Sequence, residues 1–150
     1  MKKILLVAVL LAAGYFLAAP QSDVSLPANT GQSIQPATTS ADELLARAFD
    51  QQLSNIQVEG RGIVSKILRD DNDGSRHQRL LVRLASGQTL LIAHNIDLAP
   101  RLDGVREGDE VAFHGEYEWN NKGGVIHWTH HDPQGRHAAG WLEHKGRRYQ

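Results

Sequence analysis

The pattern of hydrophobic and polar positions changes three times along the chain. Residues 4–19 are almost continuously apolar, whereas residues 20–40 contain few large apolar side chains. Between residues 41 and 54 the apolar positions recur at helical spacing, and from residue 56 onward they alternate with polar positions as in strands. The pattern therefore predicts an apolar leader, a polar linker, one helix and a β-rich domain.

The predicted helix begins at a capping box. Ser40 and Glu43 have the S-x-x-E spacing in which each residue satisfies a backbone N–H near the other. The apolar residues that follow at helical spacing are Leu44, Leu45, Ala48, Phe49 and Leu53. We expect the helix to cover about residues 41–54 and to dock this apolar stripe on the sheet.

Five strands are predicted after the helix, as three strands, a connection and two strands. Their ranges are 56–69, 78–85, 89–93, 109–119 and 124–131. Gly60 and Gly62 lie inside the first strand, where glycine often marks a bend or bulge. This order predicts an all-β fold, a small five-stranded OB-like barrel with an N-terminal helix. A small β-sandwich is the alternative, and a C-terminal hairpin at 141–150 completes the predicted domain.

The last two strands have a predicted register. With an even number of residues in their loop, the cross-strand pairs are Tyr117 with Ile126, Gly115 with Trp128 and Phe113 with His130. Because side chains alternate between faces, the interior residues are then Val111, Phe113, Tyr117, Ile126 and Trp128. The opposite face is polar, and on it Glu116 lies directly across from His127.

The N-terminus has the pattern of a secretory signal. Lys2 and Lys3 precede the apolar run, which is shorter than the roughly 20 residues of a membrane span. Pro20 directly after Ala19 is a poor cleavage junction. We therefore expect residues 1–19 to be a signal peptide or a retained N-terminal anchor, and residues 20–40 to be a flexible linker. In both cases residues 41–150 are expected to be periplasmic or secreted, with membrane contact only through an uncleaved N-terminus.

Charge and cysteine content exclude several functional classes. The formal net charge is −1, and without Lys2 and Lys3 acidic residues outnumber basic ones by three. A mildly acidic domain is not the composition of a general nucleic-acid binder, because that affinity comes from cations that neutralise phosphates. The absence of cysteine excludes disulfides, thiolate metal sites, a cysteine nucleophile and a lipid-modified cysteine.

Histidine is unusually frequent, with eight residues in the chain, five of them between residues 127 and 144. Neutral imidazole and carboxylate groups are suitable ligands for a divalent metal such as zinc. The candidate ligands are His114, Glu116, His127, His131, Asp132 and His137. Their spacing matches no established metal motif, so the alternatives are a solvated strand face and histidines that hydrogen-bond the loops.

A second candidate site follows from how OB-folds bind ligands, on strands two and three and with the loops between strands one and two and between four and five. The candidate ligand-binding residues are Arg76, His77, Trp119, Lys122 and Trp141. An aromatic side chain beside cationic groups can stack a base or a sugar. The alternative is that the tryptophans only cover the barrel and pack the C-terminal hairpin.

The glycine, aromatic and histidine positions of the C-terminal half form a recognisable pattern. They are Gly115, Glu116, residues 119–121, Gly123, Gly124, residues 126–133, Gly135, His137, Gly140, Trp141 and Tyr149. The chain resembles a bacterial family, mostly of exported proteins, that is described only as a domain of unknown function. The resemblance covers about residues 40–150 and is most specific at 120–133. It implies an OB-like domain in the cell envelope or secreted, and no particular activity.

The sequence thus leads to two functional hypotheses. The first is an exported binding module of unidentified ligand, with a histidine-rich surface that binds a divalent metal. The second is a metal-dependent hydrolase or nuclease that uses the same histidines. An enzyme needs an open coordination position and a cleft beside the metal. No G-x-S-x-G, H-E-x-x-H or phosphate-binding glycine loop is present to decide between them.

Overall fold

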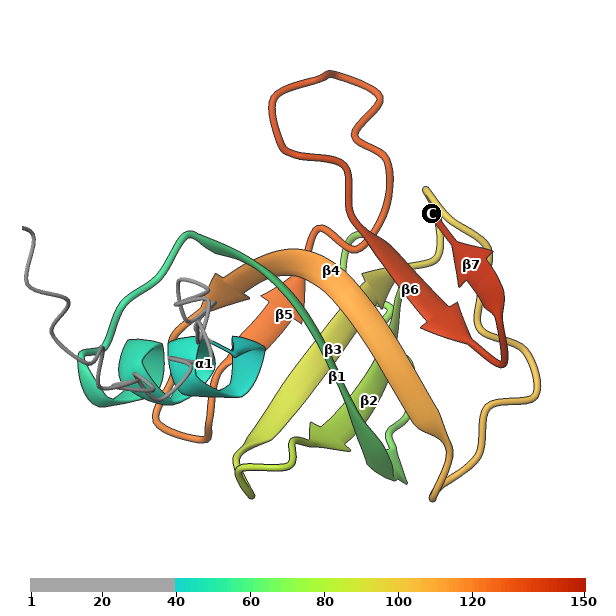
Figure 1. Ribbon diagram of the computed structural model, residues 1–150. Helices are drawn as coiled ribbons and strands as arrows, with labels where there is room; N and C mark the ends of the chain where they lie inside the picture. The colour runs from blue at the N-terminus through green and yellow to red at the C-terminus, as the bar shows by residue number, and fades with distance from the viewer. Residues whose placement is uncertain (1–39) are drawn as a thin grey trace, which may run out of the picture. The chain divides into compact units, whose positions relative to one another are not determined.

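The computed structural model describes residues 40–150, which contain one helix and seven strands joined by loops (Figure 1). They are α1 (Ala41–Asp50), β1 (Ile56–Ile67), β2 (His77–Arg83), β3 (Thr89–Asn95), β4 (Glu110–Glu118), β5 (Val125–His127), β6 (Trp141–His144) and β7 (Arg147–Tyr149). The predicted signal peptide or anchor and residues 20–39 of the predicted linker lie outside the described residues. Within residues 40–150, no helix is long and apolar enough to cross a membrane.

The first five strands close into a barrel. They are hydrogen-bonded in the order β1-β2-β3-β5-β4, and a further pairing of β1 with β4 closes the ring. The β3–β5 pair is parallel, and every other pair is antiparallel. This closed five-stranded arrangement confirms the predicted OB-like barrel and excludes the sandwich. The hairpin of β6 and β7 pairs with the first half of β4, beyond the end of β5.

Strand β1 pairs first with β4 and then with β2 along its length. Its residues from Ile56 to Ile63 pair with β4, and its last part pairs with β2 through a bulge between Val64 and Lys66. At Gly62, next to this change of partner, a Cβ would lie 2.6 Å from Val82 Cγ1. The close approach of β2 therefore requires glycine, which explains the predicted bend in this strand.

The two ends of the barrel are covered differently. At one end, α1 begins with the predicted capping box of Ser40 and Glu43 and buries Leu45 and Ala48 completely. It ends four residues earlier than predicted, and Gln52 just after it has a positive φ of 55°. At the other end, the connection between β3 and β4 has no helix or strand and places Leu102 in the core.

Strand β5 is shorter than predicted because the chain turns at Trp128. This residue has φ of 52°, in the left-handed region, which ends the strand and reverses the alternation of its side chains. Thr129 is therefore buried, and Trp128 is only half-buried. The predicted interior position of Trp128 and its pairing with Gly115 are wrong. Phe113 pairs with Leu142 of β6 instead of His130.

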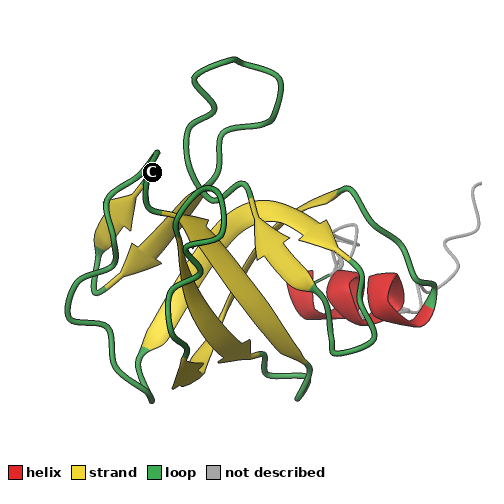
Figure 2. Cartoon of the chain, turned by 180° about the vertical axis from the view of Figure 1, so that it is seen from behind, coloured by secondary structure: helices red, strands yellow, loops and turns green. Residues whose placement is uncertain are grey.

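A long loop, residues 128–140, joins β5 to β6 and projects from the barrel in both views (Figures 1 and 2). The Asp132 carboxylate organises it by accepting hydrogen bonds from the backbone N–H groups of Gln134, Arg136 and His137. Gly140 donates to the carbonyl of His130 and closes the base of the loop. The loop thereby returns His137 to the outer face of β4.

Candidate functional site

Three potential metal ligands converge on the outer face of β4 and β5. Glu116 and Glu118 lie two residues apart on β4, so their side chains share one face of the strand. Glu116 pairs with His127 of β5, as the predicted register required. His127 Nε2 lies 3.7 Å from a Glu116 oxygen and 4.0 Å from a Glu118 oxygen. One ligand atom from each residue lies within 4.8 Å of the other two. The barrel register itself thus assembles two carboxylates and an imidazole.

The nitrogen at the centre of this group lacks a partner. His127 Nε2 is buried and makes no hydrogen bond, because both carboxylate oxygens lie beyond hydrogen-bonding distance. An unsatisfied buried polar atom costs about 1–3 kcal/mol. Burial lowers the pKa of His127, although Glu116 and Glu118 oppose this effect. The lowered pKa favours the neutral imidazole, which is the form that binds a metal.

The spacing of the three ligand atoms is close to that of a metal site. Zinc binds nitrogen and oxygen at about 2.0–2.2 Å, so neighbouring ligands of a tetrahedral site lie roughly 3.4 Å apart. The separations of 3.7 and 4.0 Å around His127 Nε2 need only small side-chain shifts to reach this value. A divalent ion would also offset the charges of the two neighbouring carboxylates.

His137 approaches the same group from the loop. Its Nδ1 lies 3.7 Å from the second oxygen of Glu116, and its ring stacks on Trp128 with the centroids 3.6 Å apart. The Asp132 carboxylate accepts a hydrogen bond from the backbone N–H of His137. This bond and the similar backbone bonds from Gln134 and Arg136, of which that from Gln134 has the largest effect, lower the pKa of Asp132. Asp132 therefore acts on His137 through the loop rather than as a ligand.

Two other candidate ligands are not part of this group. His114 donates from Nδ1 to the carbonyl of Ala139 and accepts at Nε2 from the Gln57 amide, so both of its ring nitrogens are used. His131 is exposed on the loop. Of the six candidates, the structure brings together Glu116, His127 and His137. It adds Glu118, which the two-residue alternation of β4 places on the same face.

The candidate ligand-binding residues are spread over three parts of the barrel. His77 pairs with the last residue of β3, and Arg76 is bound to Asp97 at 2.7 Å. Trp119 lies at the other end, where its indole N–H donates to the carbonyl of Phe49 in α1. Lys122 lines a shallow pocket beside α1, and Trp141 is covered by the Arg148 guanidinium at 4.0 Å. These residues form no single site.

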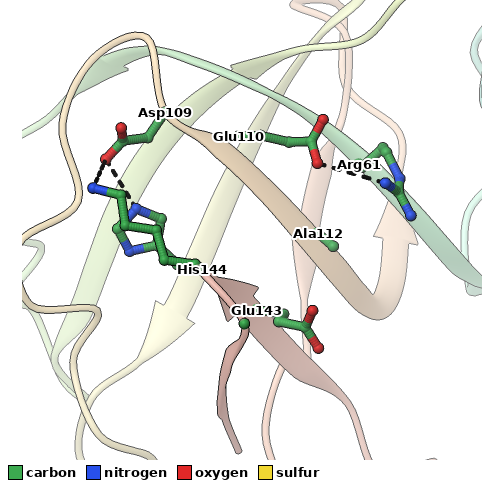
Figure 3. Close-up of a pocket in the computed structure, with 8 residues that line it drawn as sticks. Arg61, Asp109, Glu110, Ala112, Glu143 and His144 are labelled. Carbon is green, nitrogen blue, oxygen red and sulfur yellow. Dashed lines mark hydrogen bonds and ion pairs between the residues drawn. The ribbon is translucent and has the colours of Figure 1, made fainter.

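A second carboxylate–histidine pair lies at the start of β4 (Figure 3). His144 Nε2 donates to Asp109 at 2.9 Å, and the Lys145 ammonium lies 3.3 Å from the same oxygen. The hydrogen bond from His144 is the main cause of the lowered pKa of Asp109. Arg61 and Glu110 line the same cavity of about 270 Å³. The pair ties the C-terminal hairpin to β4.

Comparison with known proteins gives a family but no activity. No curated protein matches the chain. A family model described as "Protein of unknown function (DUF3465)" matches residues 29–150, which include the whole barrel, α1 and the C-terminal hairpin. The chain therefore belongs to this family of proteins of unknown function.

Proposed function

We propose that this protein is an extracytoplasmic binding module that holds a divalent transition metal, such as zinc, on the outer face of β4 and β5. Glu116, Glu118 and His127 are the ligands, and His137 approaches as the fourth group. The observation that carries the proposal is His127 Nε2, which is buried without a hydrogen bond between two carboxylate oxygens at 3.7 and 4.0 Å.

The electrostatics of the group support a cation rather than a hydrogen-bond network. Glu116 and Glu118 repel each other, and a neutral His127 provides no compensating charge. A divalent ion removes both costs, because it binds the lone pair of the nitrogen and offsets the carboxylates. The ligand set of imidazole and carboxylate also needs no thiolate, which suits an oxidising compartment.

Export of the domain is supported by the sequence alone. Lys2 and Lys3 followed by the apolar run are typical of a signal peptide or N-terminal anchor. The experiment for this part of the proposal is to fractionate cells that produce the full chain. The domain is expected in the extracytoplasmic or membrane fraction, and a purely cytoplasmic chain would contradict the export.

A metal-dependent hydrolase is the second candidate. Catalytic zinc sites keep three protein ligands and an open position, and the converging group contains three residues, without His137. Replacing His137 separates the two functions. In a closed binding site His137→Ala weakens zinc binding, whereas in an open catalytic site the affinity is retained and a hydrolytic activity accompanies the bound metal.

The test of the metal site is elemental analysis of the full chain, produced without a histidine tag and dialysed after zinc loading. We expect one zinc per chain in the wild type and none in His127→Ala. The matched control is His131→Ala, which removes an exposed histidine four residues away and should keep the zinc. Equal zinc content in the wild type and His127→Ala would overturn the proposal.

Thermal unfolding provides an independent measure of the same site. Zinc at 100 times its dissociation constant should stabilise the wild type by about 2.7 kcal/mol, because the ion binds the folded state alone. A chelator should reverse this gain. The stabilisation should be absent in His127→Ala and unchanged in His131→Ala.

A further inference from the structure

A small pocket lies on the other side of β5 from the two glutamates. Strand β5 separates β4, which carries Glu116 and Glu118, from β3, whose last residue Asn95 lines the pocket. The volume is about 250 Å³, and the walls include His77, His127, Trp128 and His130. We propose that this pocket binds an uncharged sugar ring, stacked on Trp128 and hydrogen-bonded to His77, His130 and Asn95.

The polar groups of the pocket have defined donor and acceptor roles. His77 Nδ1 lies 2.7 Å from the carbonyl of Ser75, and His130 Nδ1 lies 2.8 Å from the carbonyl of His131. A carbonyl only accepts, so each Nδ1 carries a proton, and the imidazole tautomer protonated at Nδ1 has its acceptor at Nε2. Asn95 Oδ1 accepts from the backbone N–H of Asp97, which leaves the Asn95 amide N–H groups as donors. Two acceptors and one donor match hydroxyl groups, which do both.

Trp128 provides the aromatic wall at the cost of a strained backbone. A bulky residue in the left-handed region is strained, and such residues concentrate at ligand sites. The φ of 52° is what turns the indole out of the barrel. His137 stacks on one face of the indole and does not line the pocket, so the pocket uses a part of the ring that His137 leaves open.

The charge of the pocket selects against a nucleotide. No lysine, arginine, aspartate or glutamate lines it. Arg76, beside His77 in sequence, is held by Asp97 at 2.7 Å and is not a lining residue. A phosphate group would therefore lack a cation, which is the usual basis of its binding. Leu98 adds an exposed apolar rim against which the C–H groups of a sugar can pack. The small volume fits one ring.

The pocket does not depend on the proposed metal, although the two sites share His127 and the Trp128–His137 stack connects them. The binding experiment is an NMR titration of the full chain in chelator with three methyl glycosides, those of glucose, galactose and N-acetylglucosamine. We expect at least one to produce saturable shifts of the Trp128 indole and the His77 ring, with a dissociation constant on the order of 1 mM. Trp119 and Trp141 are internal controls that should not shift.

Variants then separate this proposal from the metal site. His77→Ala should weaken glycoside binding about tenfold, the loss of one good hydrogen bond, and leave the zinc content unchanged. Glu118→Gln should lose zinc and keep glycoside binding. No shift of Trp128 with any of the three glycosides at about 100 mM would overturn the proposal. So would shifts caused by adenosine, uridine or inorganic phosphate in place of the glycosides.

Discussion

His144 and His127 each lie beside a carboxylate, but the two pairs differ in how close they come. His144 Nε2 donates to Asp109 at 2.9 Å, and the His144 side chain is 4% exposed. His127 Nε2 is also buried, yet the nearest oxygen of Glu116 is 3.7 Å away and no bond forms. The first pair is complete without any ligand. The second leaves a space between an unbonded ring nitrogen and two carboxylate oxygens.

This difference shows why a histidine count alone does not locate a site. His94 belongs with His144, because it is fully buried and both of its ring nitrogens are bonded, to Thr129 and to the carbonyl of Pro100. These histidines hold the barrel and its loops together. His127 is only half-buried, but its Nε2 atom is buried without a hydrogen bond, so a ligand at this nitrogen improves the energy.

The largest expected effect is a loss of stability when the hydrogen-bonded pair of His144 and Asp109 is broken. His144→Ala removes a nearly buried side chain and its hydrogen bond to a carboxylate, which should lower the free energy of unfolding by about 3 kcal/mol. Urea unfolding should give the same loss in zinc and in chelator. Lys145→Ala, which removes an exposed contact of Asp109, is the matched control with little effect. A loss of stability that appears only with zinc would mean that the His144–Asp109 pair also depends on a metal, and would contradict the contrast with His127.

A smaller effect is expected from pH at His94. Burial lowers the pKa of His94 from its usual 6.5 to about 4, so the unfolded chain takes up this proton at a higher pH than the folded one. The contribution of His94 is complete above pH 6.5 and is lost as the pH falls toward 4. Between pH 7 and 5 the loss is about 2 kcal/mol.

The substitution His94→Gln separates the contribution of His94 to the pH dependence of stability from that of the other histidines. It keeps a side-chain donor but cannot titrate, so its unfolding free energy should depend less on pH between 7 and 5 than that of the wild type. His131→Gln, at an exposed position, should follow the wild-type curve. Parallel curves for the wild type and His94→Gln would show that folding leaves the pKa of His94 unchanged.

The smallest expected effect is that of Glu118→Gln in the absence of metal, and zinc should reverse the sign of this change in stability. In chelator, Glu118→Gln removes the repulsion between two carboxylates and should stabilise the barrel by less than about 1 kcal/mol. With zinc it removes a ligand and should destabilise the protein. Glu110→Gln, on the same strand but paired with Arg61, should show no such reversal. A substitution with the same sign in both conditions would mean that Glu118 is no ligand.

Much of the site followed from the alternation of strands. The predicted register placed Glu116 opposite His127, and the structure has this pair. The same alternation places Glu118 on that face, although Glu118 was not among the six predicted ligands. The position of His137 beside Glu116 could not be predicted from the sequence pattern. It depends on three backbone N–H groups that donate hydrogen bonds to Asp132 within an irregular loop. Local spacing carries no information on such a loop.

The sequence alone determined the barrel, its glycine bend, the capped helix and the faces of β4, because these depend on local periodicity and on residue types with strong backbone preferences. Only the tertiary structure decided that Trp128 turns outward and Thr129 inward, since a single left-handed residue reverses the alternation without any sequence signal. It also decided which histidines are satisfied. A ring nitrogen finds its partner from distant parts of the chain, as His94 does with Pro100 and Thr129, or finds none, as at His127.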